Sequence, residues 1–279
     1  MKITENIHQL QIDFEIALSP ENKISRFVNV LIIFDKNITL IDSGVKGSEH
    51  TIFDYIKEQG RNFTEIDKII LSHAHPDHIG SAAAIKSRTG CKVYCHELEQ
   101  QWVEDIELQY KQRPVPGFFN LVDKPVTIDG FLEDNQLISI GENLTINCLH
   151  TPGHSKGLLS FFFIEDKIMF TADAIPLKND LPNYDNFTQL EKSLKTIKNS
   201  GNYITLLTSW TPAITDSSQM YQLILEGETY LKKLDKAVKK HYKGEPVLAL
   251  DNCKNCIDEL GLPPFFINPI VNKAFCSHL

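Results

Sequence analysis

The hydrophobic and polar positions of the chain predict strands and helices in two successive batches. The first batch opens with the apolar runs 27–34 and 38–42, which flank a polar turn and are typical of a hairpin. A helix is expected over residues 48–60, because Ser48 suits its N-cap and Gly60 follows its last turn. The same reasoning predicts strands at 66–71 and 92–96 and helices at 81–90 and 97–112.

The second batch, from residue 137 onward, repeats a similar order of elements. Apolar runs predict strands at 137–140, 144–150, 158–164, 168–173 and 203–208, with a helix over 188–201. An amphipathic helix is expected from Ser217 to about Tyr242, and the tail, residues 245–279, predicts a short strand and one or two helices. Two such batches suit a sandwich of two sheets with helices outside, and no linker-like segment divides them.

The composition is that of an ordinary globular protein, and the charge narrows the partners. Of the 279 residues, 42% are hydrophobic, which is enough for a sizeable core. The net charge of −8 opposes binding to a polyanion, and the densest basic run, Lys232–Lys240, has the spacing of a solvated helix face. We therefore expect a small-molecule substrate and no nucleic-acid partner.

Neither the N-terminus nor any internal run predicts a membrane segment or an export signal. Residues 1–15 contain no sustained apolar stretch, and the longest apolar runs are far too short to cross a bilayer. Six cysteines in a chain of this length do not make a disulfide scaffold. We expect a cytoplasmic protein with reduced thiols and no membrane partner, and the sequence leaves its oligomeric state open.

The segment SHAHPDH carries the strongest chemical signal. It places His73, His75, Asp77 and His78 after a predicted buried strand and before a predicted helix. Imidazole and carboxylate groups are costly to bury without partners, so this cluster points to a metal site. On extended backbone the side chains of His73 and His75 point the same way and can share one ion. Pro76 then ends the strand, so Asp77 and His78 can aim at a second ion nearby.

Two later segments supply further ligands of the same kind. His154 follows a predicted strand in LHTPGHS, and Asp173 ends a predicted strand in IMFTADA. Either residue alone would be an ordinary turn or capping residue. Together with the histidine cluster, and in this order along the chain, both are expected to bind metal.

These motifs resemble the metallo-β-lactamase-fold superfamily, in particular its glyoxalase-II-like metal-dependent hydrolases. The resemblance covers most of residues 25–215 and rests on the segments TLIDSG, SHAHPDH, TPGHS and FTADA. It implies an α/β (α+β) fold, a four-layer αβ/βα sandwich with the metals in a cleft at one edge between the two sheets. We accordingly expect a catalytic domain over residues 1–215 and a helical C-terminal extension over residues 216–279, packed on the same domain.

The resemblance also implies a role for each candidate residue. It implies two metal sites, one formed by His73, His75 and His154 and the other by Asp77, His78 and Asp173. Asp173 would bridge two ions, and Asp42 in TLIDSG would orient the ligands rather than bind metal itself. The expected cofactor is zinc, as one or two ions, with iron or manganese as alternatives.

The fifth motif of the superfamily is where this sequence departs from it. Members typically end a strand with a Gly-His-Gly-like turn whose histidine completes the second metal site. Here the turn is TSWTP, and the position holds Trp210, whose indole nitrogen can only donate a hydrogen bond. We expect weaker binding of the second ion, or added room for substrate at Trp210, unless Asp185 or His278 folds back into the site.

The expected activity is metal-dependent hydrolysis of a small ester, thioester or lactone, with phosphodiesters next in order. A metal-activated water would attack the substrate, and Asp77 would orient this water and take its proton. One alternative is a mononuclear non-haem iron oxidoreductase of the persulfide dioxygenase type, with His73, His154 and Asp173 as ligands. Another is a ligand-binding protein with a modified metal site.

Aromatic residues outside the motifs suggest where the substrate enters. Phe118 and Phe119 lie in the proline-rich segment 113–125, and Phe265 and Phe266 lie in an unusually apolar tail. We expect the four rings to line an apolar entrance to the metal site, together with Trp210.

Cys253 and Cys256 form a C-x-x-C pair, with Cys276 and His278 further along the chain. Four such groups could form a structural zinc site. However, residues 251–260 have a helical pattern, in which two thiols three residues apart simply share a face, and this favours plain thiols.

Overall fold

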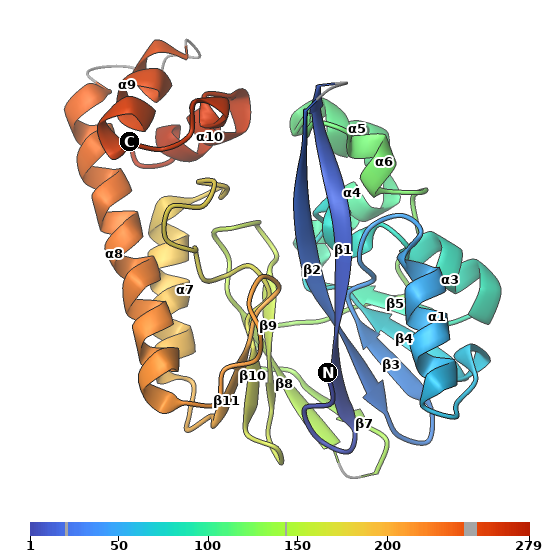
Figure 1. Ribbon diagram of the computed structural model, residues 1–279. Coiled ribbons are helices and arrows are strands. Elements are labelled where there is room, and N and C mark those ends of the chain that lie inside the picture. The colour runs from blue at the N-terminus through green and yellow to red at the C-terminus, as the bar shows by residue number, and fades with distance from the viewer. Residues whose placement is uncertain (20–21, 143, 243–249) are drawn as a thin grey trace.

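The computed structural model describes residues 1–19, 22–142, 144–242 and 250–279 and contains two β-sheets that face each other between outer layers of helices (Figure 1). The first sheet has six strands, in the order β1 (Ile7–Ser19), β2 (Asn22–Phe34), β3 (Ile38–Ile41), β4 (Ile66–Ile70), β5 (Lys92–Cys95) and β6 (Gly130–Phe131). Strands β1 to β3 are antiparallel and β3 to β6 are parallel. The crossovers contain α1 (Ser48–Glu58) and α3 (Ala82–Thr89), as parallel strands require.

The second sheet has five strands and carries the long helices on its outer face. Its order is β11 (Thr205–Leu207), β10 (Ile168–Phe170), β9 (Leu159–Phe163), β8 (Leu144–His150) and β7 (Leu137–Ile140). All neighbours are antiparallel except β10 and β11, which are joined through α7 (Phe187–Asn199). Helix α8 (Ser217–His241) lies beside α7 (Figure 1).

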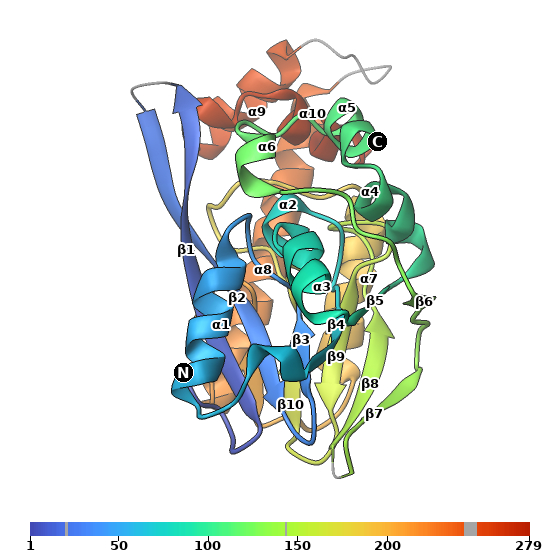
Figure 2. The same cartoon turned by 90° about the vertical axis from the view of Figure 1, so that its right-hand side faces the viewer.

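The remaining helices gather largely at one end of the sandwich. They are α2 (Pro76–Ile79), α4 (Gln100–Glu104), α5 (Ile106–Gln112), α6 (Phe118–Leu121), α9 (Asp251–Leu260) and α10 (Pro269–Cys276), with short 3-10 turns at Phe63–Glu65, Glu97–Glu99 and Pro264–Phe266. Figure 2 shows α5 and α6 at the same end as α9 and α10. Within the described ranges, no helix is both long enough and apolar enough to span a bilayer.

The core follows from the alternation of side chains along the strands. In β2, Val30 and Ile32 pack toward the helices, whereas Leu31 and Ile33 pack between the two sheets. The inner faces of the second sheet meet them with buried aromatic rings such as Phe161. The predicted four-layer sandwich is therefore confirmed, as are the hairpin of β2 and β3 and the long helix from Ser217.

Several predicted elements differ in detail. The N-cap of α1 is Gly47, in the left-handed conformation, and Ser48 is the first helical residue. The helix predicted over 97–112 is broken at Asp105, whose side chain accepts a hydrogen bond from Leu108 N at 2.9 Å and so starts α5. The sequence did not reveal β1 or the one-turn helix α6. In the tail, residues 250–279 contain α9, a 3-10 turn and α10, which agrees with the expected helices. The expected strand is not among them, and residues 245–249 lie outside the described residues.

Candidate metal centre

Loops from both sheets bring the candidate ligands together at one edge of the sandwich. The segment after β4 carries four of them. Pro76 begins the short helix α2 directly after His75, so Asp77 and His78 lie in a helical turn rather than in the expected open turn. His154 lies in the loop between β8 and β9, and Asp173 follows β10. Gly153 permits the first of these loops, because its φ is +127° and a Cβ would lie 2.3 Å from the backbone nitrogen of Leu190.

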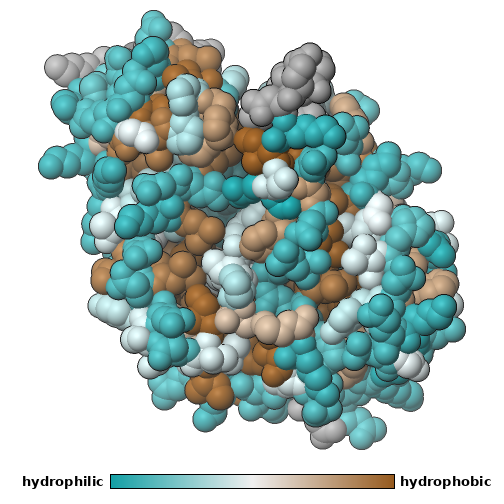
Figure 3. Space-filling view, viewed as in Figure 1, coloured by the Kyte–Doolittle hydropathy of each residue, from teal (hydrophilic) through white to brown (hydrophobic). Residues whose placement is uncertain are grey.

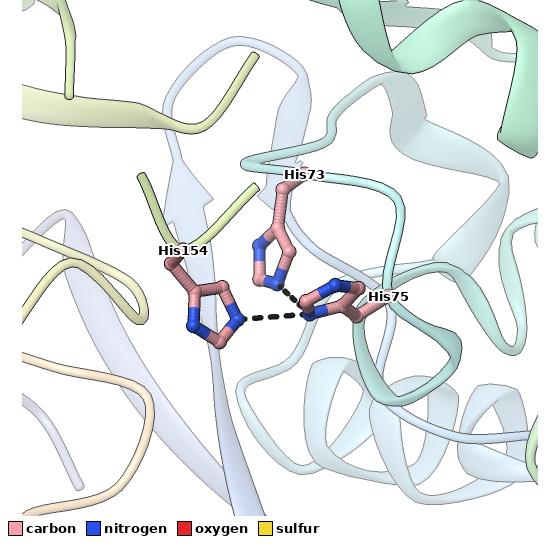
Figure 4. Close-up of side chains that lie close together, drawn as sticks. All are labelled: His73, His75 and His154. Atoms are coloured by element: carbon pink, nitrogen blue, oxygen red, sulfur yellow. Dashed lines mark hydrogen bonds between the residues drawn. The ribbon is translucent and has the colours of Figure 1, made fainter. Parts of the chain in front are cut away.

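One cluster consists of three buried imidazoles. Figure 4 shows the rings of His73, His75 and His154 pointing toward one another. The Nδ1 atom of His75 lies 3.0 Å from Nε2 of His73 and 2.8 Å from Nε2 of His154. A tetrahedral zinc ion with Zn–N bonds of about 2.0–2.1 Å would hold its nitrogens about 3.3 Å apart. The observed spacing is close to this value, so the three nitrogens fit one ion with small adjustments.

A second cluster shares His73 with the first and adds His78 and Asp173. One carboxylate oxygen of Asp173, Oδ1, lies 3.3 Å from Nε2 of His78, and the other, Oδ2, lies 3.3 Å from Nε2 of His154. Asp173 thus faces both clusters, as expected for a bridging ligand. Asp77, expected in the second site, is not in the tight cluster, but its Oδ2 lies 3.7 Å from Nε2 of His78.

Asp42 and Ser72 fix the orientation of two imidazoles. Nδ1 of His78 donates to Oδ2 of Asp42 at 2.8 Å, which leaves Nε2 facing the cluster. The hydroxyl of Ser72 donates to the same oxygen at 2.8 Å, so its own oxygen can accept from Nδ1 of His73 at 3.0 Å. Both histidines therefore direct Nε2 toward the centre, and this is the ring nitrogen that a metal would bind.

Buried atoms without a hydrogen-bond partner also fit a metal site. Among the described side chains, Nε2 of His78 and Oδ1 of Asp173 are buried and have no such partner, although they lie close to each other. Unpaired buried polar atoms are rare because no hydrogen bond offsets the free-energy cost of removing them from water. The donor set and its burial thus fit a bound metal.

Burial and charge set the protonation of the centre in opposite directions. Burial lowers the pKa of His73 and His75 well below the usual value, and it lowers the pKa of His154 to about 4. Burial also acts to lower the pKa of His78, but the neighbouring carboxylates outweigh it and raise this pKa well above the usual value. Three imidazoles are therefore neutral near pH 7 and ready to bind an ion.

Glu99 supports the centre from outside, although no sequence motif marks this residue. This buried carboxylate accepts from the backbone nitrogen of Ala74 at 2.9 Å through Oε2. Its Oε1 accepts from the hydroxyl of Ser155 at 2.7 Å and from the nitrogen of Gly157 at 2.6 Å. Glu99 thus joins the loop that carries His73 and His75 to the loop that carries His154.

A cavity of about 420 Å³ opens beside the centre and includes His75, Asp77, His154 and Asp173 in its lining. The strands β1 and β2, the loops around residues 113–116 and 175–184, and the C-terminal segment form its mostly apolar walls. In Figure 3 the surface is hollowed below the C-terminal helices, and hydrophobic residues border the hollow.

The predicted pocket residues divide into two groups. Trp210, Phe265 and Phe266 line the cavity, and the guanidinium of Arg26 lies 4.6 Å from the centre of the Trp210 ring. The prediction for Phe118 and Phe119 was wrong. Phe118 is 2% exposed and packs into the core below the first sheet, and Phe119 faces solvent outside the cavity. The proline-rich segment instead reaches the cavity through residues 113–116.

The alternatives for a replacement ligand and for a structural zinc site find no support. Asp185 pairs with Lys273 at 2.8 Å, and His278 lies 2.7 Å from the hydroxyl of Tyr184 and 3.1 Å from Asp235. The cysteines at 253, 256 and 276 are free thiols and, within the described chain, belong to no group of metal-binding side chains. Neither candidate joins the centre.

Comparisons with known proteins agree with the motifs. The family model of the metallo-β-lactamase superfamily matches residues 25–209. A probable metallo-hydrolase of Bacillus subtilis is 31% identical over 147 residues, which cover 52% of this chain and 64% of that protein. A hydroxyacylglutathione hydrolase of Haemophilus influenzae is 29% identical over 155 residues, which cover 53% of this chain and 66% of that protein. The matches thus span slightly less than two thirds of these relatives.

Solved structures show the same architecture. A metallo-β-lactamase family protein of Thermus thermophilus superimposes with a TM-score of 0.74 at 17% identity, covering 100% of this chain and 93% of that one. The metallo-β-lactamase GOB-18 of Elizabethkingia meningoseptica gives a TM-score of 0.61 at 24% identity, covering 75% of this chain and 87% of that one. At these identities the likeness shows the fold alone. Motifs, fold and family match together show that the chain belongs to the metallo-β-lactamase superfamily.

Proposed function

We propose that this protein is a zinc-dependent hydrolase that cleaves a small ester, thioester or lactone. The observation that carries the proposal is the pair of clusters that share His73 beside a mostly apolar cavity. His75 and His154 would complete one metal site, and His78 and Asp173 the other. The relative named as a hydroxyacylglutathione hydrolase supports thioesters among the substrates.

When bound, zinc lowers the pKa of a water molecule to about 7 and polarises the oxygen of the bond to be cleaved. The protein would supply the remaining steps. The carboxylate of Asp77 lines the cavity beside His78, where it can orient the attacking water and accept its proton. Burial raises the pKa of Asp77, which makes it a better base and lets it return the proton to the leaving group.

Trp210 favours a second candidate function. Because it lines the cavity and cannot bind metal, the centre could hold one ion rather than two. A single iron held by His73, His154 and Asp173 would suit a non-haem oxidoreductase of the persulfide dioxygenase type. Metal content therefore separates the two candidates.

The test combines metal content with activity. We expect protein purified without chelators to contain zinc and to hydrolyse at least one ester, thioester or lactone of a small panel. His73→Ala should lower kcat/KM at least about 100-fold, because it removes a residue shared by both clusters. His50→Ala, a matched change on the exposed face of α1, should leave kcat/KM unchanged.

Two results would contradict the hydrolase. One iron per chain, with oxygen consumption in the presence of persulfides, would establish the oxidoreductase instead. The other result is zinc-loaded protein that cleaves no member of the panel, with no difference in activity between H73A and the parent. It would indicate a ligand-binding protein with a modified metal site.

A further inference from the structure

Arg113 is a buried cation that faces the cavity. It directly follows the last residue of α5, is 7% exposed and contributes to the lining of the cavity. The guanidinium donates one hydrogen bond, to Oδ1 of Asn183. In the part of the chain that the structure describes, no carboxylate pairs with it within 4.0 Å. Buried arginine is normally paired, so an anion from outside the chain would complete this site.

The other arginine of the cavity shows what a satisfied guanidinium looks like in the same place. Arg26 donates two hydrogen bonds to Asp180, at 3.1 and 3.0 Å, and its charge is thereby balanced. Arg113 has only the neutral amide of Asn183, which accepts from one of its amino groups, so its other N–H groups have no side-chain acceptor in the described chain. The two arginines thus differ in whether they can accept an anion.

The charge of the metal-loaded centre points the same way. Two divalent ions would carry a charge of +4, which the buried carboxylates of Asp42, Asp77 and Asp173 would reduce to +1. Arg113 adds a further positive charge beside them, in a cavity with mostly apolar walls. Like charges in a cavity of low polarity repel strongly. An anionic group on the ligand would reduce the repulsion between the metal ions and Arg113.

We propose that Arg113 binds an anionic group, a carboxylate or a phosphate, on the substrate of this centre. The substrate class would then be an amphipathic anion whose apolar body lies against residues such as Ile16, Leu181 and Phe266. A guanidinium suits both anions because its planar fork can donate two parallel hydrogen bonds. The proposal rests on the proposed function, since it concerns the substrate of the same site.

Binding without turnover tests the subsite. Three probes of similar length are titrated by calorimetry into zinc-loaded full-length protein: octanoate, octyl phosphate and the neutral octanamide. We expect at least one anion to bind 10-fold or more tightly than octanamide, because charge-assisted hydrogen bonds in a buried site are strong. Arg113→Met should remove most of this preference while leaving octanamide binding unchanged.

Two further variants keep the test decisive. Lys111→Met makes the same change of charge on the exposed side of α5 and should retain the full preference. Arg113→Lys keeps the charge but loses the planar fork, and we expect a loss of about 3-fold or more for the anions; it decides the matter if R113M does not fold. If the substitutions of Arg113 weaken binding of just one of the two anions, that anion identifies the group that the site binds.

The outcomes separate this proposal from the hydrolase. Anion preference that survives in both R113M and R113K would show that the metals, not Arg113, bind the anion, and would overturn the proposal. Absence of any preference in the parent protein would also overturn it. If the preference depends on Arg113 but no ester, thioester or lactone is cleaved, the anion subsite stands and the hydrolase falls.

Discussion

At the scale of single residues, Asp42 carries more of the centre than its place outside the clusters suggests. It is fully buried and has a φ of +63°, a left-handed backbone that is uncommon for residues other than glycine, asparagine and aspartate. Its two oxygens accept from the nitrogen and hydroxyl of Ser72 and from the ring of His78. One carboxylate thereby holds the loop after β4 in place and orients the ring of His78, whose Nδ1 carries the proton.

Asp42→Asn tests this role without disturbing the backbone, since asparagine tolerates the left-handed conformation. The amide offers one acceptor oxygen where the carboxylate offers two, so His78 or Ser72 loses a partner. We expect zinc affinity, measured against a competing chelator, to fall by about 10–100-fold. Asp54→Asn, on the exposed side of α1, should not change the affinity. Equal affinity in D42N and the parent would show that Asp42 does not orient the ligands.

At the scale of elements, the two loops that carry the histidines are joined by Glu99. The loop after β4 belongs to the first sheet and the loop between β8 and β9 belongs to the second, so no shared strand fixes their spacing. Glu99 bridges them with three hydrogen bonds of 2.6–2.9 Å. We infer that it is a positioning residue, which acts on the metal through the loops.

Glu99→Gln replaces one of the two acceptor oxygens by an amide group that faces a donor. The variant leaves at least one buried donor unpaired, which costs about 1–3 kcal/mol. We expect a lower melting temperature and, separately, weaker zinc binding, because His154 is no longer held against the first cluster. Excess zinc should restore the activity of E99Q at temperatures below its transition, as a positioning role requires.

Glu97→Gln is the matched control, since Glu97 is exposed two residues earlier. It should change neither the melting temperature nor the zinc affinity. If E99Q melts early but binds zinc as tightly as E97Q, Glu99 stabilises the fold and does not position the ligands.

How much the sequence could predict depended on whether a feature is local. His73 to His78 lie in one short segment at the end of a strand, so residue type and spacing together pointed to a metal centre. The roles of Arg113 and Glu99 depend on loops that meet only in the folded chain, and neither residue stands in a recognisable pattern. Phe118 was misassigned for the same reason, because the turn at Gly117, with φ +69°, begins a short helix that packs its ring into the core.

At the scale of the whole molecule, the metal centre lies across the two halves of the sandwich. The segment after β4 supplies candidate ligands from the first sheet, whereas the candidates His154 and Asp173 come from the second. The sheets are also joined by their own core, in which rings such as Phe161 and Phe170 are fully buried. Metal should therefore strengthen the contact between the halves without being required for the fold.

Removal of metal by a chelator should lower the melting temperature and leave a folded protein. Ligands that bind only the native state stabilise it by about 4 kcal/mol at a free concentration 1,000 times the dissociation constant, which corresponds to a shift of several degrees or more in a chain of this size. Calorimetry with and without chelator measures the shift, and circular dichroism at 25 °C checks that the secondary structure persists. His73→Ala should show little further shift with chelator, because it has already lost the residue shared by both clusters. An equal melting temperature with and without metal would mean that the ions do not tie the two halves together, and unfolding at 25 °C would mean that the core between the sheets is insufficient alone.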